Sequence, residues 1–476
     1  MTTPRRSIAW FRQDLRIADN PALTEACKSG VAFAVYVLDD VNSEDWSMGG
    51  ASRWWLHHSL AALDEQLGGN LSVFTGDARR IIPALAEETG ADAVYWNRCY
   101  EPWRIRRDSD LKRELQEQDM TVRTFNGSSL FEAPTVKKGD GTPYKVFTPF
   151  YKNGCLRDVA PPRRPLPAPA IDAIEKISSS MQLDDLDLLP SINWADTMAA
   201  TWQPGELGGN ERLAEFLGDG LADYSDNRNR PDVAGVSRLS PYLHFGELSP
   251  NQVWYAAHDT NMPEAVAEPF TRQLCWREFS TNLLYNNPQL PTENLQSKFD
   301  RFPWRDDPAA LRAWQRGQTG IPIVDAGMRE LWQTGYMHNR VRMIVGSFLI
   351  KNLMLHWELG ERWFWDTLLD ADLANNSASW QWVAGTGADA APYFRVFNPV
   401  LQGTKFDPDG DYVRRYVPEI AGLPKKYLNS PWEAPAEVLK DAGVALGENY
   451  PKPIVDLKET RDRALAAFKS LKPPGD

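Results

Sequence analysis

Short apolar runs alternate with amphipathic stretches over the first quarter of the chain. Runs rich in β-branched and aromatic residues predict strands at 7–11, 32–38, 71–74, 93–96 and 122–125. The stretches between them predict helices that start at Pro21 and that cover 51–67, 79–88 and 104–118. Strands and helices in alternation predict a doubly wound parallel sheet. No GxGxxG motif follows the first strand, so the common dinucleotide fingerprint is missing here.

The pattern changes after about residue 157. The text PPRRPLPAPA, followed by acidic and Ser-rich residues, predicts a partly extended connector as far as about residue 205. Beyond it, apolar residues recur at helical spacing and strand signals are scarce. Since 476 residues exceed one compact core, we expect an α/β domain over 1–134, a connector over 135–205 and an all-helical domain over 206–476.

Composition and charge narrow the class of protein. Hydrophobic content of 42% and charged content of 24% are those of a soluble globular protein, and the longest apolar runs are too short to span a membrane. The first residues lack a secretory signal, and the four cysteines have neither CxxC spacing nor a cluster of histidines. We therefore expect a cytoplasmic protein with reduced thiols and no metal site. A net charge of −12 argues against indiscriminate nucleic-acid binding but leaves room for a local basic groove.

The segment 357–399 has an unusual composition. It contains five tryptophans, two adjacent asparagines, Asn375 and Asn376, and the aspartates Asp370 and Asp372. An indole N–H needs a partner when it is buried, so this density is unusual for a plain core. Redox chemistry on a bound aromatic cofactor would explain it. The alternative is an aromatic-rich helical core.

Two earlier segments carry further candidate binding residues. In 235–250, the hydroxyls of Ser237 and Ser240 with the guanidinium of Arg238 would suit a pyrophosphate, although a serine at such a place is often a helix N-cap. In 272–280, Gln273, Trp276 and Arg277 fall within about one helical turn, and a flat aromatic ligand could stack on Trp276. The alternative there is a helix with one buried tryptophan.

A third segment, 334–352, predicts a helix with a mixed face. Asn339 and Met343 are four residues apart and share one side, with Arg342 close by. His338 has no serine or cysteine partner in view, so it predicts no catalytic triad.

Long motifs in the same order resemble the photolyase/cryptochrome family. They are AWFRQDLR, YKVFTPFYK, SRLSPYLHFGELS, WREF, TGIPIVDAGMREL, MHNRVRM and SWQWVAGTGADAAPYFRVFNP. The chain looks like a bacterial cyclobutane pyrimidine dimer photolyase of class I or class III. The resemblance implies an N-terminal α/β antenna domain, a long connector and a helical domain that binds FAD.

The resemblance also implies the residues around the cofactor and the lesion. Those expected to hold FAD are Tyr224, Ser237, Arg238, Leu239, Ser240, Arg277, Asn339, Arg342, Asp370, Asp372 and Asn376. Asn376 would face flavin N5, Arg342 would pair with Asp370, and Val236 replaces a threonine common in the family. Those expected to contact the flipped-out dimer are Gln273, Trp276, Arg340, Met343 and Trp382.

The implied activity is light-dependent repair of DNA that contains pyrimidine dimers. Reduced FAD, excited by blue light, would donate an electron to the flipped-out dimer and so split it. Trp380, Trp357 and Trp304 match the family's chain of indoles that carries an electron from the surface to the flavin. We expect the enzyme to act as a monomer.

Two departures from the common pattern keep alternatives open. Gln273 stands where class I members usually carry Glu. Photolyases of the six-four type resemble this chain in having Gln there, but they carry histidines where this chain has Asn339 and Met343. The text NSAS before Trp380 replaces NNGG, which favours the class III branch near plant cryptochromes. A cryptochrome photoreceptor without repair is the main alternative, although the chain shows no long tail after 459–469. A light-independent flavoprotein oxidoreductase would need a hydride-donor motif that we do not find.

The antenna site departs from class I as well. Pro102, Trp103 and Arg104 follow the Tyr100-Glu101 pair, so the class I folate contacts are missing. We expect 5,10-methenyltetrahydrofolate in a different pose, as in class III, stacked on tryptophan or bonded to Glu101. A deazaflavin or an empty site are the alternatives.

Overall fold

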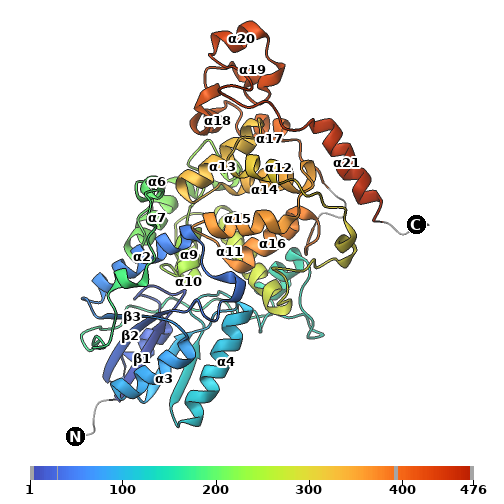
Figure 1. Ribbon diagram of the computed structural model, residues 1–476. Helices are drawn as coiled ribbons and strands as arrows, with labels where there is room; N and C mark the ends of the chain where they lie inside the picture. The colour runs from blue at the N-terminus through green and yellow to red at the C-terminus, as the bar shows by residue number, and fades with distance from the viewer. Residues whose placement is uncertain (1–4, 29, 391–394, 472–476) are drawn as a thin grey trace. The chain divides into compact units, whose positions relative to one another are not determined.

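The fold was analysed in a computed structural model that describes residues 5–28, 30–390 and 395–471. Backbone contacts divide the chain into two units, each continuous in space but not in sequence (Figure 1). The first unit contains Met1–Ala222, Ser237–Pro288 and Leu369–Ala374, and the second contains Asp223–Val236, Gln289–Leu368 and Asn375–Asp476. The domain boundaries at residues 134 and 205 stay predictions.

The first unit is built on a five-stranded parallel sheet. Its strands are β1 (Arg5–Phe11), β2 (Gly30–Leu38), β3 (Leu71–Thr75), β4 (Ala93–Asn97) and β5 (Thr121–Phe125). The spatial order is β3-β2-β1-β4-β5, and Ile8 on the central strand β1 lies opposite Phe33 on one side and Val94 on the other. All five predicted strands are therefore confirmed, and so is the doubly wound arrangement.

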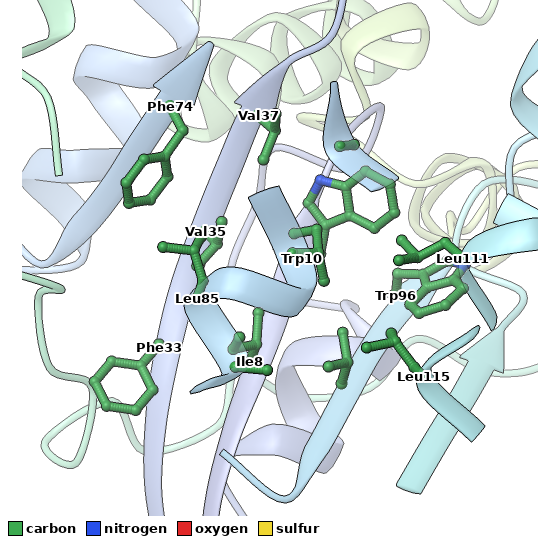
Figure 2. Packing of buried hydrophobic residues seen from close by; sticks show 14 of the residues in the cluster. Ile8, Trp10, Phe33, Val35, Val37, Phe74, Leu85, Trp96, Leu111 and Leu115 are labelled. Atoms are coloured by element: carbon green, nitrogen blue, oxygen red, sulfur yellow. The ribbon is translucent and has the colours of Figure 1, made fainter. Parts of the chain in front are cut away.

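Helices cover both faces of this sheet. They are α1 (Pro21–Ala26), α2 (Gly50–Gln66), α3 (Ala78–Thr89) and α4 (Pro102–Glu117), close to the predicted spans. Asn20 caps α1 by accepting from the Leu23 amide, and Asp77 caps α3 by accepting from the Arg79 amide. Figure 2 shows the core beneath α3 and α4, where alternate residues of the strands, such as Ile8 and Trp10, meet leucines of the two helices.

The predicted connector runs along the sheet rather than standing free of it. The Ala32 amide of β2 donates to the Ala173 carbonyl at 3.0 Å, and the Met181 amide donates to the Val73 carbonyl of β3 at 3.1 Å. These backbone bonds fix two points of the segment to strands β2 and β3.

The rest of the described chain is helical, with no further β-strand after residue 125 in the described ranges. In the first unit the helices are η1 (Glu44–Trp46), α5 (Phe147–Pro149), η2 (Phe150–Cys155), η3 (Leu183–Leu186), α6 (Asp196–Ala199), α7 (Glu206–Glu215), η4 (Phe216–Gly220), α9 (Ser240–Phe245), α10 (Pro250–His258) and α11 (Glu264–Asn286). In the second unit they are α8 (Tyr224–Asn227), η5 (Ser297–Arg301), α12 (Pro308–Gln315), α13 (Pro322–Thr334), α14 (Asn339–Ser347), η6 (Phe348–Asn352), α15 (Trp357–Thr367), α17 (Pro399–Phe406), α18 (Asp411–Tyr416), η7 (Pro418–Ile420), α19 (Lys425–Leu428), η8 (Pro431–Glu433), α20 (Ala436–Asp441) and α21 (Leu457–Lys469). Helix α16 (Leu373–Ala384) starts in the first unit and continues in the second. The predicted all-helical second half is confirmed, and within the described ranges we find no helix whose length and apolar character would let it cross a bilayer.

Candidate functional site

Three predicted residues share one face of helix α11. Gln273, Trp276 and Arg277 are half-buried, whereas Leu274 and Cys275 between them are buried. The spacing i, i+3, i+4 places the three side chains on the same side of the helix. The structure therefore groups the amide, the indole and the guanidinium, as the sequence predicted.

Trp276 is held by a partner that the sequence did not reveal. Its ring stacks on Phe147 of α5 with centroids 3.6 Å apart and planes 8° apart. Since Phe147 covers one side of the indole, only the opposite side can accept another ring. The Gln273 side chain is oriented by its Nε2, which donates to the Pro269 carbonyl at 2.9 Å.

Arg277 is fixed by backbone and charge. Its Nη1 donates to the Ser128 carbonyl at 2.8 Å and to Glu278 Oε1 at 3.2 Å. Burial raises the pKa of Glu278 to about 7, against the lowering effect of Arg277 and of two backbone amides. This pair anchors α11 to the segment that follows the sheet, so the position of Arg277 is set within the first unit.

The predicted phosphate loop precedes helix α9. Arg238 has a left-handed backbone (φ +55°), and its guanidinium lies 5.1 Å from the centre of the Trp202 ring. The N-cap residue is Leu239, which has no side-chain cap, and Ser240 is the first, exposed residue of the helix. Neither Ser237 nor Ser240 is the N-cap of α9, so helix capping does not explain these two serines.

Asp370 and Asp372 lie in the turn between α15 and α16. Both are half-buried, and the Asp372 amide donates to the Asp370 carbonyl at 2.7 Å. Both carboxylates raise the pKa of His244 of α9, a buried residue that the sequence did not single out. Burial lowers the pKa of His244 despite the opposing effect of both aspartates, so the imidazole is neutral at neutral pH.

In the second unit, helix α14 carries the predicted polar face. Asn339 is its exposed first residue, and Met343 one turn later is half-buried. The Arg340 Nη2 donates to Asn229 Oδ1 at 2.6 Å, and its guanidinium lies 4.4 Å from the Phe406 ring centre.

Two further predicted residues of this unit are held by local contacts. Arg342 donates from Nε to the Met337 carbonyl at 2.7 Å. Tyr224 begins α8 and is buried beneath the Arg228 guanidinium, 5.4 Å from its ring centre. Pairing of Arg342 with Asp370 stays a prediction.

Asn376 is buried in α16, and its amide orientation is determined by one bond. Its Nδ2 donates to the Glu361 carbonyl of α15 at 3.0 Å. A flipped amide would place two oxygens against each other, so the nitrogen must face the carbonyl. The side-chain oxygen is thereby left as the acceptor on the other side.

The predicted tryptophans differ in their surroundings. Trp380 is buried, 5.0 Å from the Phe364 ring and 6.2 Å from the Trp314 ring, and its Nε1 has no hydrogen-bond partner among the described residues. Trp357 is fully buried, and its Nε1 donates to Asn294 Oδ1 at 3.0 Å.

The outer part of this series contains a ring that the sequence did not identify. The half-buried Trp304 lies 5.1 Å from His356, and His356 stacks on Trp357 at 5.4 Å. The structure thus places Trp304, His356 and Trp357 in one row. Trp382, two residues after Trp380, is half-buried.

Comparison with protein families identifies both halves of the chain. Residues 7–170 match the model for DNA photolyase, and residues 270–470 match the model for the FAD binding domain of DNA photolyase. A deoxyribodipyrimidine photo-lyase from Agrobacterium fabrum is 48% identical over 98% of both chains. The chain belongs to the photolyase/cryptochrome family.

Other relatives cover the same length. Cryptochrome-1 of Arabidopsis thaliana is 37% identical over 98% of this chain and 70% of its own. The crystal structure of a bacterial class III photolyase from Agrobacterium tumefaciens superposes with a TM-score of 0.93 at 46% identity and covers 99% of this chain and 98% of that one. These matches confirm the predicted family, the photolyase fold and the predicted enzyme, a deoxyribodipyrimidine photo-lyase.

The photolyase residues present here suit the FAD that the family model implies. Arginine guanidiniums and serine hydroxyls, at Arg238, Ser237 and Ser240, are donors that bind phosphate oxygens. Asn376 offers a buried acceptor oxygen for a ring N–H. This donor set fits a flavin dinucleotide, whose chemistry as an electron donor the protein tunes through such contacts.

Proposed function

We propose that this protein is a light-dependent repair enzyme that splits cyclobutane pyrimidine dimers in DNA, of the class III branch. Bound FAD, when reduced and excited by blue light, supplies the electron that opens the dimer. The carrying observation is Asn376, a buried neutral amide whose nitrogen is committed to the Glu361 carbonyl. Its free oxygen can accept from a flavin N–H without adding negative charge, which favours a reduced, electron-donating cofactor.

The lesion side of the proposal rests on α11. The Phe147–Trp276 stack presents one indole face, and a flipped-out dimer can lie against that face. Gln273 and Arg277 on the same side of the helix would hold the dimer edges, with Arg340, Met343 and Trp382 as the remaining proposed contacts. The phosphates flanking the lesion would be neutralised by arginines, so binding would weaken as salt rises.

Restoration of the reduced cofactor is assigned to Trp380, Trp357 and Trp304. Trp304 is the partly exposed member of the series, whereas Trp380 and Trp357 are buried. An electron from an outside donor would enter at Trp304 and leave the series at Trp380. His356, in contact with both outer indoles, is part of this row.

For the antenna we propose 5,10-methenyltetrahydrofolate beside Glu101. Glu101 follows β4 at the point where the strand order reverses, a usual place for ligands in such sheets. Its buried Oε2 has no hydrogen-bond partner among the described residues, while Oε1 lies 3.3 Å from Arg104 Nε. The Trp103 ring already contacts the guanidiniums of Arg104 and Arg107, so the carboxylate is the better contact for a pterin N–H. E101Q should therefore weaken folate retention, measured by absorbance of the purified protein.

The test of the proposed function is repair of a thymine-dimer oligonucleotide by purified, reduced protein under blue light. A six-four oligonucleotide and a dark sample run alongside. Loss of the dimer alone, and only in light, supports the proposal. Repair of the six-four lesion instead would show that the enzyme acts on that lesion, as its Gln273 would allow.

A matched pair of variants sharpens the test. W276A should abolish binding of the lesion, whereas W254F on α10, a half-buried indole outside the proposed site, should leave repair unchanged. If photoreduction persists in protein that repairs neither lesion, a photoreceptor role takes the place of repair. We further infer a monomer that acts in the cytoplasm, where its four free thiols stay reduced.

A further inference from the structure

A buried carboxyl group lies behind Asn376 that the proposed reaction does not use. Glu361 of α15 is fully buried. Its Oε1 is hydrogen-bonded to the Ser377 hydroxyl of α16, and its Oε2 has no hydrogen-bond partner among the described residues. The same residue provides the backbone carbonyl that orients Asn376.

The two helices meet closely at this point (Figure 1). A Cβ added to Gly360 would lie 2.1 Å from the Trp380 ring, so only glycine lets the indole approach α15 here. Asn376, Ser377 and Trp380 of α16 are thus all packed against residues 360 and 361. Glu361 therefore contacts Asn376 through its backbone carbonyl and Ser377 through its carboxyl, and its chain neighbour Gly360 lies against the Trp380 ring.

No described cation pairs with this carboxyl. The neighbouring Arg362 turns outward, where its guanidinium bonds Glu358 Oε1 at 3.0 and 2.9 Å and remains 45% exposed. From helix η6, the buried Lys351 donates to the Arg395 carbonyl. An ionised carboxylate with a single hydroxyl donor is strongly disfavoured in such a buried site.

Burial, the largest effect, raises the pKa of Glu361 to about 8, and Glu358 raises it further while Ser377 and Arg362 lower it. At neutral pH Glu361 is therefore an uncharged carboxylic acid. Both charged residues that act on it belong to its own helix and face solvent, and from α16 its printed polar contact is the Ser377 hydroxyl.

We propose that Glu361 and Ser377 form a neutral acid–hydroxyl pair that tunes the charge of the flavin site through Asn376. While Glu361 keeps its proton, it adds no negative charge behind Asn376. Loss of that proton to water would place a carboxylate beside Ser377, one residue from Asn376, and disfavour a reduced, anionic cofactor. Glu361 is a positioning residue, and this role rests on the proposed use of reduced FAD.

The test measures the reduced fraction of the FAD-loaded protein in the dark, at a fixed applied potential, across the pH range. As pH rises through about 8, the reduced fraction should fall further in the wild type than in E361Q, whose amide cannot ionise. The difference between the two proteins should be on the order of tenfold. S377A removes a contact that lowers the pKa, so its transition should move to higher pH. E358Q removes a charge that raises the pKa, so its transition should move to lower pH, opposite to the shift in S377A.

Infrared difference spectra of wild type against E361Q give a second readout that needs no repair. A carboxylic acid carbonyl band at neutral pH that E361Q lacks supports the neutral acid. Absence of that band, or a pH transition that survives in E361Q, would overturn the proposal. A protein that shows the band and the transition but repairs no lesion would refute the proposed function alone.

Discussion

Two regions of the molecule place a tryptophan beside a fully buried glutamate, and they differ in how the polar atoms are used. In the first unit, Trp55 donates from Nε1 to both carboxyl oxygens of Glu247 at 3.1 Å, and the Gly205 amide donates to Oε1 at 2.6 Å. In the second unit, neither Trp380 Nε1 nor Glu361 Oε2 has a hydrogen-bond partner among the described residues.

The difference indicates a structural role for Glu247 and a role in the proposed chemistry for Glu361. Burial raises the pKa of both carboxyls to about 8, so the pKa alone does not distinguish them. The hydrogen-bond donors do, because Glu247 joins α2, α9 and the segment before α7 through bonds that need its oxygens. Buried polar atoms left without partners are uncommon in folded proteins, and each one calls for an explanation such as a bound water, a ligand or a redox role.

The largest effect should come from Trp380. W380F keeps an aromatic ring but a smaller one, so the free energy of unfolding should fall by about 1–2 kcal/mol, whereas reduction of the flavin by light and an external donor should drop to background. Chemically reduced W380F should still repair. The control is W55F, which loses the bond to Glu247 and should photoreduce at the wild-type rate. Normal photoreduction in W380F would remove Trp380 from the electron path.

The next largest effect should be the loss of unfolding free energy when Glu247 is replaced. E247A leaves the Trp55 and Gly205 N–H groups buried without an acceptor, which should cost about 3 kcal/mol of unfolding free energy in urea titrations. E361Q should cost less than about 1 kcal/mol, because the amide can still bond to Ser377. Equal losses in the two variants would mean that both glutamates are structural.

How far the sequence predicted these regions depends on the range of the contacts. The strands β1 to β5 follow from local alternation, and the helical face of Gln273, Trp276 and Arg277 follows from spacing, so both were predictable. The stack of Phe147 on Trp276 and the bond between Ser377 and Glu361 join separate segments. Periodicity within one segment contains no information about such pairs.

Some of the missed residues nevertheless left a signal. His356 directly precedes Trp357, so a row of rings could have been extended by one position. Ser377 stands where the family pattern NNGG has its second asparagine, and a hydroxyl at a buried position must find a partner. The connector was predicted as extended, but its pairing with β2 and β3 depends on strand edges that the sequence does not reveal.

A further effect is expected in the pH dependence of stability. The pKa of Glu361 rises from its ordinary 4.5 to about 8 on folding, so the folded state binds the proton more tightly. The resulting stability is complete below about pH 4.5 and is lost as pH rises through about 8, a difference of a few kcal/mol. E361Q should flatten this slope in unfolding experiments at several pH values. A slope unchanged in E361Q would show that Glu361 ionises without the cost that its burial predicts.

The smallest effect should come from Trp357. Its fully buried indole is bonded to the neutral amide of Asn294, whereas Trp55 is bonded to a carboxyl and Trp380 has no partner among the described residues. N294A removes that acceptor and should cost about 1 kcal/mol of stability. It should also slow photoreduction modestly, because an indole that has lost an electron is stabilised by a hydrogen bond from its N–H. N294D keeps an acceptor and adds negative charge, so it should restore the rate or exceed it. If both variants photoreduce like the wild type, the bond to Asn294 serves stability alone, and Trp357 belongs with Trp55 on the structural side of the comparison.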